Sequence, residues 1–494
     1  MAGKYIIGVD QSTQGTKALL FDERGEIIKR VDKPHKQLIN EDGWVSHNPT
    51  EIYENTIEVI TTLIQNVQIS PEEVKGLSIS NQRETSVAWD KITGEPLDNA
   101  IVWQCSRAAQ ICERIAEQGH AELIRERTGM NLSPYFPASK IAWIFENVAG
   151  AKEKASVREL CHGTMDSWLI YKLTEGKSYK TDYSNASRTQ LFNIFDLKWD
   201  EEICGIFGID VKNLPEVCDS NAMFGETSLE GFLKQPIPIH AVMGDSHAAL
   251  FGQGCLDAGM TKATYGTGSS IMMNIGSEPV LSTHGVITSL AWSMNGVVNY
   301  VLEGNLNYTG AVVTWLKDDL NLIESPKETE YLIQEALKDD EVYLIPAFSG
   351  LGAPYWNSEA RAAIVGMNRA TRKPEIVRAA IECIAYQITD ILEAMSRDAK
   401  KAVTELRVDG GSIKNHYLMQ FQSDIAKLNV LAPNAEELSG IGAAYAAGLA
   451  LEIWDRRIFD KLKCKTYYPR MEESIQRRKY AGWKNAVDMV LRYD

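Results

Sequence analysis

Residues 5–32, YIIGVDQSTQGTKALLFDERGEIIKRVD, contain the pattern from which the architecture of this chain can be inferred. Its apolar run at 5–10 predicts a buried strand, the hydroxyl-rich segment at 11–16 a turn, and the run at 17–22 a second strand. A second turn at 23–26 leads into a third strand. Glycine and hydroxyl side chains in the first turn would let backbone N–H groups approach phosphate oxygens closely, although an ordinary Gly-rich hairpin turn has the same composition.

Helices and strands alternate along the chain that follows. A helix is predicted from 51 to about 65, after Pro49-Thr50, and a strand over 74–80 ends at the polar cluster NQRET. This alternation is typical of an α/β protein.

The same strand–turn–strand pattern returns in the second half. The segment MTKATYGTGSSIMMN, residues 260–274, has a Gly-Thr-Gly turn between two strands. Two such units predict two domains with similar cores that face each other, and duplication favours a phosphate-binding role for both turns. We place the boundary in GQGCLDAG, whose glycines can serve as a hinge. This gives an N-terminal domain over 1–252 and a C-terminal domain over 253–494.

Length and composition exclude several classes of function. The 494 residues suffice for two domains, and 44% hydrophobic with 24% charged residues is ordinary for a globular protein. The formal net charge of -15 argues against nucleic acid and anionic membranes as partners. No run approaches the ~20 apolar residues of a membrane span. The eight cysteines are scattered without a Cys-x-x-Cys pair, and the N-terminus does not resemble a signal peptide, so we expect a cytoplasmic protein.

Two carboxylates stand where predicted strands end. Asp10 closes the first strand beside the phosphate-type turn, where an oxygen ligand could hold Mg²⁺. Asp245 follows the apolar run at 239–244 and precedes a predicted helix, where it could accept a proton from an attacking hydroxyl. Taken singly, an aspartate at either position can equally be a helix cap or turn residue.

A polar and aromatic group suits a polyol. Arg83-Glu84 follows a strand and offers a fork of donors and a charged acceptor to adjacent hydroxyls. Trp103 and Tyr135 could stack against the carbon face of such a ligand. A surface ion pair and two core aromatics are the alternative that spacing alone leaves open.

Near the C-terminus, residues 406–425 predict a strand, the turn Asp409-Gly410-Gly411 and a helix from about Lys414. Glycines before a helix leave a flat shelf on which a purine could lie, although a tight helix cap would have the same sequence.

Two segments connect these observations to a known family. YFPASKIAWIFEN at 135–147 and AAIVGMNRATRKPEIVRAAIE at 362–382 are similar to the two signatures of the FGGY carbohydrate kinases, and the similarity runs from about Tyr5 to Trp483. Within that family the chain most resembles the glycerol kinases. The resemblance implies two actin-like ATPase domains of the ribonuclease H type with the active-site cleft between them. It also implies an enzyme that uses ATP and Mg²⁺ to phosphorylate a hydroxyl of a small polyol or sugar, and it is compatible with a homodimer or homotetramer.

The family's functional positions transfer onto this sequence residue by residue. Asp245 matches the catalytic base and Asp10 the position that helps to hold Mg²⁺. Glycerol-side positions match Arg83, Glu84, Trp103 and Tyr135, and Ser246 and Ser270 fall in the same pocket. Nucleotide-side positions match Thr13, Gln14, Lys17, Gly266, Thr267, Gly310, Gly411 and Asn415.

Three positions depart from the glycerol kinase pattern. Ser246 stands where glutamine is usual, Ser270 where phenylalanine lies against the glycerol carbons, and Lys17 where the family has arginine. A hydroxymethyl group in place of a ring predicts a roomier, more polar pocket for a tetritol, pentitol or ketose. A glycerol kinase with a weakened pocket is the alternative. Lys17 keeps the positive charge of arginine but lacks the guanidinium, which can donate two parallel hydrogen bonds to a phosphate.

Two other classes of function share the phosphate turns. A non-catalytic actin-like ATP-binding sensor or scaffold needs neither a polyol group nor a base, so the presence of Arg83, Trp103 and Asp245 favours the enzyme. Hydrolysis of ATP without an acceptor predicts turnover that is independent of added polyol.

Overall fold

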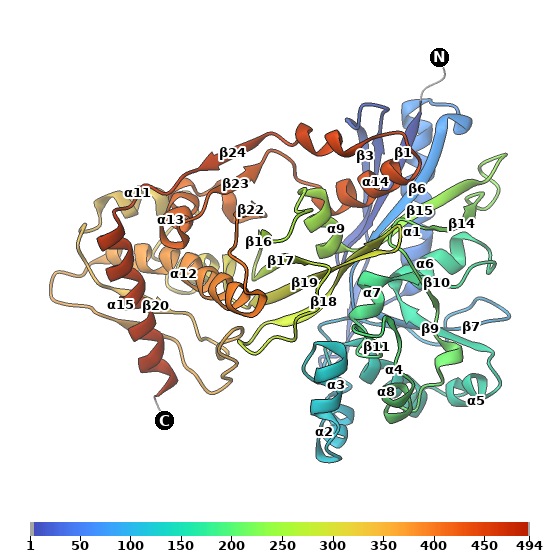
Figure 1. Ribbon diagram of the computed structural model, residues 1–494, viewed down its shortest axis with the longest axis horizontal. Helices are drawn as coiled ribbons and strands as arrows, with labels where there is room; N and C mark the ends of the chain where they lie inside the picture. Colours follow the sequence, from blue (N-terminus) through green and yellow to red (C-terminus); the bar gives the residue numbers. More distant parts are fainter. Residues whose placement is uncertain (1–3, 493–494) are drawn as a thin grey trace.

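The first half of the chain is built on a mixed six-stranded sheet. The computed structural model describes residues 4–492, and Figure 1 shows this sheet at the N-terminal end of the molecule. The strand order is β14-β15-β6-β1-β2-β3. The strands are β1 (Tyr5–Gln11), β2 (Gly15–Phe21), β3 (Ile27–Pro34), β6 (Val74–Asn81), β14 (Met223–Thr227) and β15 (Ile237–Gly244). β1 pairs antiparallel with β2 and parallel with β6, and β6 pairs parallel with β15.

The second half repeats this topology in a seven-stranded sheet of order β18-β19-β17-β16-β22-β23-β24. Its strands are β16 (Met260–Tyr265), β17 (Ser269–Gly276), β18 (Ile287–Met294), β19 (Val297–Leu306), β22 (Glu405–Asp409), β23 (Val430–Pro433) and β24 (Cys464–Tyr467). β16 takes the place of β1, because it pairs antiparallel with β17 and parallel with β22. The predicted pair of related strand–turn–strand units is therefore confirmed.

Shorter strands and many helices surround the two sheets. A third sheet contains β4 (Gln37–Ile39), β5 (Val45–His47), β7 (Ser86–Asp90), β8 (Ala100–Ile101) and β9 (Leu160–Thr164). Two-stranded pairs are formed by β10 (Lys180–Asp182) with β13 (Glu216–Cys218), β11 (Phe192–Asn193) with β12 (Lys198–Trp199), and β20 (Tyr343–Ile345) with β21 (Ala363–Val365). The helices are α1 (Pro49–Val67), α2 (Ala109–Glu117), α3 (Ala121–Thr128), α4 (Pro137–Asn147), α5 (Ala151–Ser156), α6 (Met165–Leu173), α7 (Tyr183–Ser187), α8 (Glu201–Ile206), α9 (Asp245–Gly252), α10 (Gly310–Thr314), α11 (Glu328–Glu335), α12 (Lys373–Ala399), α13 (His416–Ala426), α14 (Leu438–Ala450) and α15 (Glu473–Leu491).

Local sequence explains where the predicted helices begin. Asn48 caps α1 by accepting hydrogen bonds from the N–H groups of Thr50 and Glu51, and Pro49 occupies the first turn, where its missing N–H costs nothing. The helix predicted from Lys414 begins two residues later, at His416. Residues 411–414 form a 3₁₀ turn instead, because the side chain of Asn415 caps α13 by accepting from Leu418 N.

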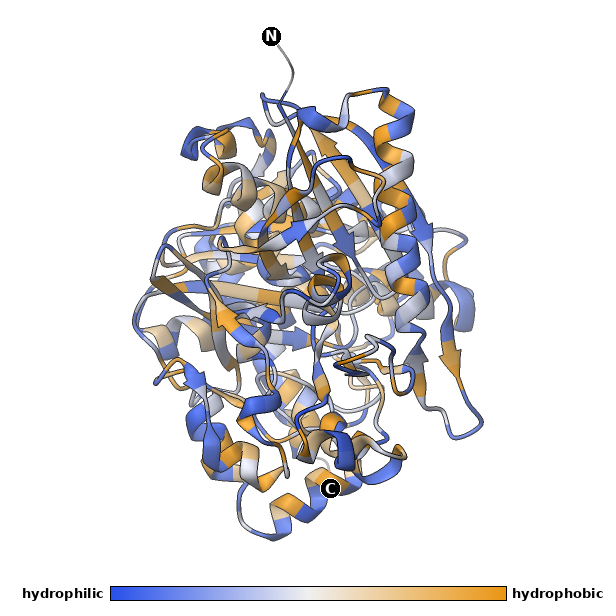
Figure 2. Ribbon diagram, turned by 90° about the vertical axis from the view of Figure 1, so that its right-hand side faces the viewer, coloured by the Kyte–Doolittle hydropathy of each residue, from blue (hydrophilic) through white to orange (hydrophobic). Residues whose placement is uncertain are grey.

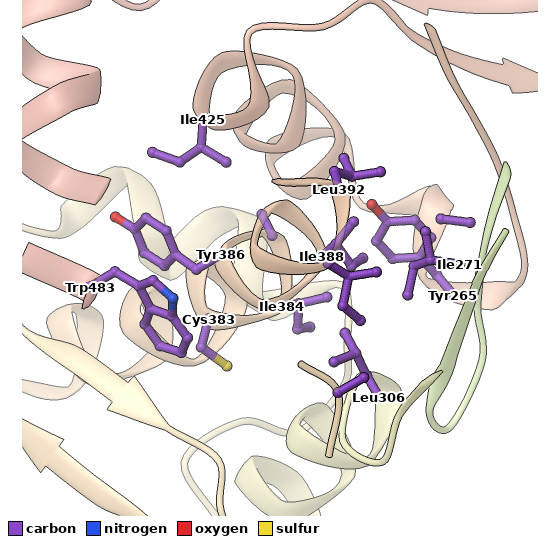
Figure 3. Packing of buried hydrophobic residues seen from close by; sticks show 14 of the residues in the cluster. Tyr265, Ile271, Leu306, Cys383, Ile384, Tyr386, Ile388, Leu392, Ile425 and Trp483 are labelled. Atoms are coloured by element: carbon purple, nitrogen blue, oxygen red, sulfur yellow. The ribbon is translucent and has the colours of Figure 1, made fainter. Parts of the chain in front are cut away.

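The long helix α12 organises the core of the second half. Figure 3 shows its residues Ile384 and Ile388 beside Tyr265 and Ile271, which come from β16 and β17. On another side of α12, Tyr386 stacks against Trp483 of α15 with ring centroids 5.2 Å apart. Figure 2 shows hydrophobic residues concentrated on the inner strands, while outer helices carry both kinds of side chain.

Helix α14 belongs to the second half by sequence but packs on the first sheet. In Figure 1 it lies beside β1 and β6. The two glycines Gly8 and Gly440 allow this approach, because a Cβ on Gly8 would lie 2.9 Å from the carbonyl oxygen of Gly440. The two halves therefore share a hydrophobic cluster. No helix within residues 4–492 is both long and apolar enough to cross a bilayer.

Candidate active site

The predicted site residues of the first half gather where three parallel strands end. Gln11 of β1 and Gly244 of β15 both pair with Asn81 of β6, so the three carboxyl ends are level. Asp10, Arg83 and Asp245 consequently lie along one edge of the sheet. Side chains at the carboxyl ends of adjacent parallel strands are well placed to act together.

A cavity of about 510 Å³ lies between this edge and the second sheet. Its walls include nine residues that the sequence singled out: Thr13, Arg83, Glu84, Trp103, Tyr135, Asp245, Ser246, Thr267 and Ser270. The structure thus brings together the predicted base, the predicted polyol group and part of both phosphate turns.

Arg83 and Glu84 are fixed by a buried network of ion pairs. Arg83 donates through Nη1 and Nη2 to Glu303 of β19 at 2.9 and 3.0 Å. The sequence predicted that this fork would bind ligand hydroxyls, but in the structure both Nη atoms are hydrogen-bonded to the buried carboxylate of Glu303 instead. Arg188 donates through Nε to Glu84 at 2.6 Å, and its Nη1 lies 3.0 Å from Glu303. Burial opposes the charge of Glu303, but Arg188 and Arg83 hold its pKa well below the usual range. Glu84 keeps Oε2 for another donor.

The aromatic wall is tied to the first phosphate turn. Trp103 donates through Nε1 to Thr13 Oγ1 at 3.0 Å, and its ring centroid lies 5.6 Å from that of Tyr135. His35 also contacts this turn, because its Nε2 lies 2.9 Å from the carbonyl oxygen of Thr13. The polyol pocket and the phosphate turn are therefore mechanically connected.

The second sheet provides a row of polar side chains as the opposite wall. Thr264 pairs with Ser270 across β16 and β17, and Ser270 pairs with Asn305 across β17 and β19, so all three lie on one face of the sheet. Each lines the cavity. The hydroxyl of Ser270 is buried and finds no hydrogen-bond partner among residues 4–492. A buried hydroxyl without a partner is costly, and a hydroxyl of a ligand would relieve that cost.

Asp245 begins α9 and is held by its neighbours on both sides. Its Oδ1 accepts from the N–H of Ser246 at 2.6 Å and lies 3.4 Å from Nε of Arg83. The preceding N–H, that of Gly244, donates to Ser184 Oγ at 3.0 Å, and Ser184 donates to buried Asp182 at 2.9 Å. The carboxylate is one-third exposed, which leaves it accessible from the cavity.

Asp10 carries the expected features of a cation ligand. It accepts from Ser80 Oγ at 2.9 Å, and the ammonium of Lys17 lies 3.8 Å away. Burial raises the pKa of Asp10 to about 6, with Lys17 lowering it and Asp245 raising it further. A carboxylate destabilised by burial and by a second carboxylate fits Mg²⁺, a hard cation with a preference for oxygen. Residues 4–492 contain no cluster of three or more His, Cys, Asp or Glu side chains suited to a metal, so phosphate oxygens and water would complete the shell.

The structure separates some of the other predicted nucleotide positions. Gly310, Gly411 and Asn415 line a second cavity of about 530 Å³ between α10, α11 and α13. Gly266 joins the two regions, because Gly310 N donates to its carbonyl oxygen at 2.9 Å. Lys17 donates to Glu437 at 2.8 Å and faces Asp10, while Gln14 lines neither cavity.

Sequence reasoning missed several residues of the site, among them Arg188, Thr264, Glu303 and Asn305. One signal was available, since Glu303 is a charged residue inside the apolar strand sequence YVLEGNL, and such residues are rarely buried unless paired.

Comparison with known proteins agrees with this geometry. The family model for the N-terminal domain of the FGGY family of carbohydrate kinases matches residues 5–252, and that for the C-terminal domain matches residues 261–451. Glycerol kinase 1 of Thermotoga maritima is 48% identical over 490 residues and covers 99% of both chains.

Solved structures show the same fold. Plasmodium falciparum glycerol kinase with ADP has a TM-score of 0.94 and 35% identity, covering 100% of this chain and 99% of its own. Gluconate kinase of Lactobacillus acidophilus, at 23% identity and a TM-score of 0.89 with 99% of both chains covered, shares the fold. The predicted two-domain ribonuclease H-like architecture is confirmed, and a non-catalytic sensor or scaffold is not favoured. The chain belongs to the FGGY family of carbohydrate kinases and is an enzyme that uses ATP and Mg²⁺ to phosphorylate a hydroxyl of a small polyol or sugar.

Proposed function

We propose that Asp245 is the general base of this kinase and that the cavity around it binds the acceptor polyol. Asp245 takes the proton of the acceptor hydroxyl, and that oxygen forms a bond to the γ-phosphorus of ATP. The bond between the γ-phosphorus and the β,γ-bridging oxygen breaks, and its electron pair leaves with ADP. The observation that carries this proposal is the single cavity shared by Asp245, the Arg83–Glu84 pair and both phosphate turns.

The other predicted residues take roles that follow from their positions. Glu84 Oε2 accepts a hydrogen bond from an acceptor hydroxyl, while Trp103 and Tyr135 cover the carbon chain. Thr13 and Thr267 donate to the phosphates, and Gly310, Gly411 and Asn415 border the nucleoside. Asp10 would hold Mg²⁺, which when bound neutralises charge on the phosphates. The units 1–252 and 253–494 close on each other around both substrates and exclude water.

For the acceptor we propose a four- or five-carbon polyol or ketose. The unpartnered Ser270 hydroxyl supports this choice, because an additional substrate hydroxyl would satisfy it where a ring would exclude it. Glycerol is the second candidate, favoured by the likeness to glycerol kinases at 48% identity. The two differ in one expectation: restoring an aromatic side chain at position 270 should harm turnover of the longer acceptor and favour glycerol.

ADP release from Mg-ATP across a panel of glycerol, tetritols, pentitols and ketoses tests both proposals. Asp245→Asn should abolish acceptor-dependent turnover, and retention of wild-type turnover would reject the assigned base. Ser270→Phe should lower kcat/KM for the best longer acceptor by about 10- to 200-fold relative to glycerol. The matched variant Ser270→Ala removes only the hydroxyl. A wild-type preference for glycerol that Ser270→Phe leaves unchanged would contradict the four- or five-carbon acceptor.

We also propose that the enzyme works in the cytoplasm as a homodimer or homotetramer. All eight cysteines are free thiols, in keeping with a reducing compartment. Exposed apolar side chains on β3 and β4, which are consecutive in sequence, support self-association; they are Ile27, Ile28, Leu38 and Ile39. Light scattering after size exclusion tests the assembly, and a monomer at micromolar concentration would contradict it.

A further inference from the structure

Lys262 is a buried ammonium that the reaction described above does not use. It lies on β16, two residues before Thr264, and its side chain is 1% exposed. Within residues 4–492 it forms no ion pair, and Thr264 Oγ1, at 2.8 Å from Nζ, is its one hydrogen-bond acceptor. Burial lowers the pKa of Lys262; Asp409 opposes this shift, Arg83 adds to it, and Asp245 and Glu303 favour the charged form.

This hydrogen bond determines which way the Thr264 hydroxyl points. An ammonium has three donors and no acceptor, so Thr264 Oγ1 must accept from Lys262. The Thr264 O–H must then donate elsewhere, and no other residue in 4–492 accepts it. Thr264 lines the cavity that also contains Asp245 and Thr267. Its hydroxyl is therefore a donor directed into that cavity.

The position of Thr264 in the second sheet corresponds to that of Asp10 in the first sheet. Thr264 is the equivalent in β16 of Asp10 in β1, because each lies one residue before the end of its strand and pairs with the second residue after the turn. The phosphate turns begin two residues further along the chain, at Ser12 and at Gly266. Thr264 thus occupies in the second sheet the position that Asp10 occupies in the first, and it lines the cavity together with Asp245 and Thr267.

We propose that Thr264 donates a hydrogen bond to the phosphoryl group in transit, and that Lys262 is the positioning residue that fixes this polarity and adds positive charge behind it. The proposal rests on the proposed function, because it takes Asp245 as the base and this cavity as the place of transfer. A donor already oriented toward the site of developing charge stabilises the transition state without reorganisation. Lys262 acts through Thr264, so the two side chains form one unit.

The kinetic test separates this role from a structural one. Thr264→Val, which keeps the shape and removes the hydroxyl, should lower kcat by about 100- to 1,000-fold, with the KM for the acceptor and the Kd for ADP nearly unchanged. Thr264→Ser, which retains the donor, should recover most of the loss. A Thr264→Val enzyme with kcat within twofold of wild type, or with a raised acceptor KM and normal kcat, would overturn the proposal.

Lys262 is tested with a double-variant cycle in the full-length enzyme. Lys262→Met should lower kcat in the same way, and the Lys262→Met/Thr264→Val enzyme should be no slower than the slower single variant, since both remove one unit. Multiplicative losses would overturn the coupling. Thermal melts and ADP titrations identify any variant that fails to fold. If Lys262→Met does not fold, the comparison of kcat between Thr264→Val and Thr264→Ser still tests the role of the Thr264 hydroxyl. Failure of the proposed function is distinguishable, because Asp245→Asn would then remain active.

Discussion

The guanidinium of Arg83 and the carboxylate of Glu303 join the two halves of the chain through parallel hydrogen bonds of 2.9 and 3.0 Å, across 220 residues of sequence. Both side chains are buried, and Glu303 also faces Arg188. The pair fixes Arg83 beside Asp245 while linking the sheets on either side of the cavity.

Neutralising Glu303 should be costly. Glu303→Gln leaves Arg83 and Arg188 with insufficient negative charge in a buried place, so we expect the free energy of unfolding to fall by about 3–5 kcal/mol. Urea unfolding measures this change. Glu473→Gln is the matched control, because Glu473 is 61% exposed and pairs with Lys427 and Arg477 on the surface, where solvent screens the charges and the loss of stability should be much smaller. Equal losses of unfolding free energy in the two variants would show that the buried network contributes no more to stability than the surface ion pairs do.

Asp10 should make the stability of the ligand-free enzyme depend on pH. Its folded-state pKa is about 6, above the ordinary value of 3.8, so between these values the folded state binds more protons than the unfolded state. Stability should therefore fall as pH rises from about 4 to 6, by up to about 3 kcal/mol. Asp10→Asn should lose this decline and be more stable than wild type at pH 7. Denaturant midpoints from pH 4.5 to 7.5 measure the difference, with exposed Asp32→Asn as control. Parallel curves for wild type and Asp10→Asn would refute the raised pKa.

Two adjacent glycines should respond differently to alanine. Gly410 has φ of +96°, and its Cβ would lie 2.4 Å from the carbonyl oxygen of Tyr265, so Gly410→Ala should destabilise the fold by about 1–3 kcal/mol or more. A Cβ on Gly411 would meet nothing within 4 Å, although Gly411 lines the proposed nucleoside cavity. Gly411→Ala should therefore keep the melting temperature and raise the KM for ATP several-fold. An unchanged KM would place the nucleoside elsewhere.

Ser184 should influence catalysis without touching a substrate. Ser184→Ala removes the acceptor of Gly244 N and one donor to Asp182, so Asp245 should shift and kcat should fall by about 10- to 100-fold. Ser220→Ala also removes a donor to Asp182, at 2.7 Å, but does not contact Gly244. Both variants should lose about 1–3 kcal/mol of stability, while Ser184→Ala alone should lower kcat. A similar kcat in both would show that the effect is only structural.

The sequence predicted the parts of this site that follow from strand ends. Asp10 closes a recognisable apolar run, Asp245 follows another directly, and Arg83 lies two residues beyond the end of β6; parallel pairing aligns such ends at one edge. The Gly-Thr-Gly turn before Ser269 was equally visible, because turns between apolar strands have a clear composition.

Residues in the middle of strands and on loops could not be placed in the same way. Asn305 reaches the cavity only because the register of β17 and β19 sets it opposite Ser270, and that register depends on tertiary packing. Arg188 contacts Glu84 across 104 residues of sequence, and no local pattern indicates this pairing. The position of α14 was hidden for a similar reason, although its small residues, including Gly440, are suited to close packing.

Helix α14 also affects how the chain can be synthesised. The first sheet emerges from the ribosome long before the helix that covers one of its faces, since α14 follows the last residue of the N-terminal segment by roughly 200 residues, or on the order of 10–40 s of translation at typical rates. During that interval an apolar surface around Gly8 stays open to water, to chaperones and to other nascent chains. Truncation before Leu438 should therefore yield aggregates, and expression of residues 1–252 alone should require α14 supplied as a separate peptide or grafted by circular permutation.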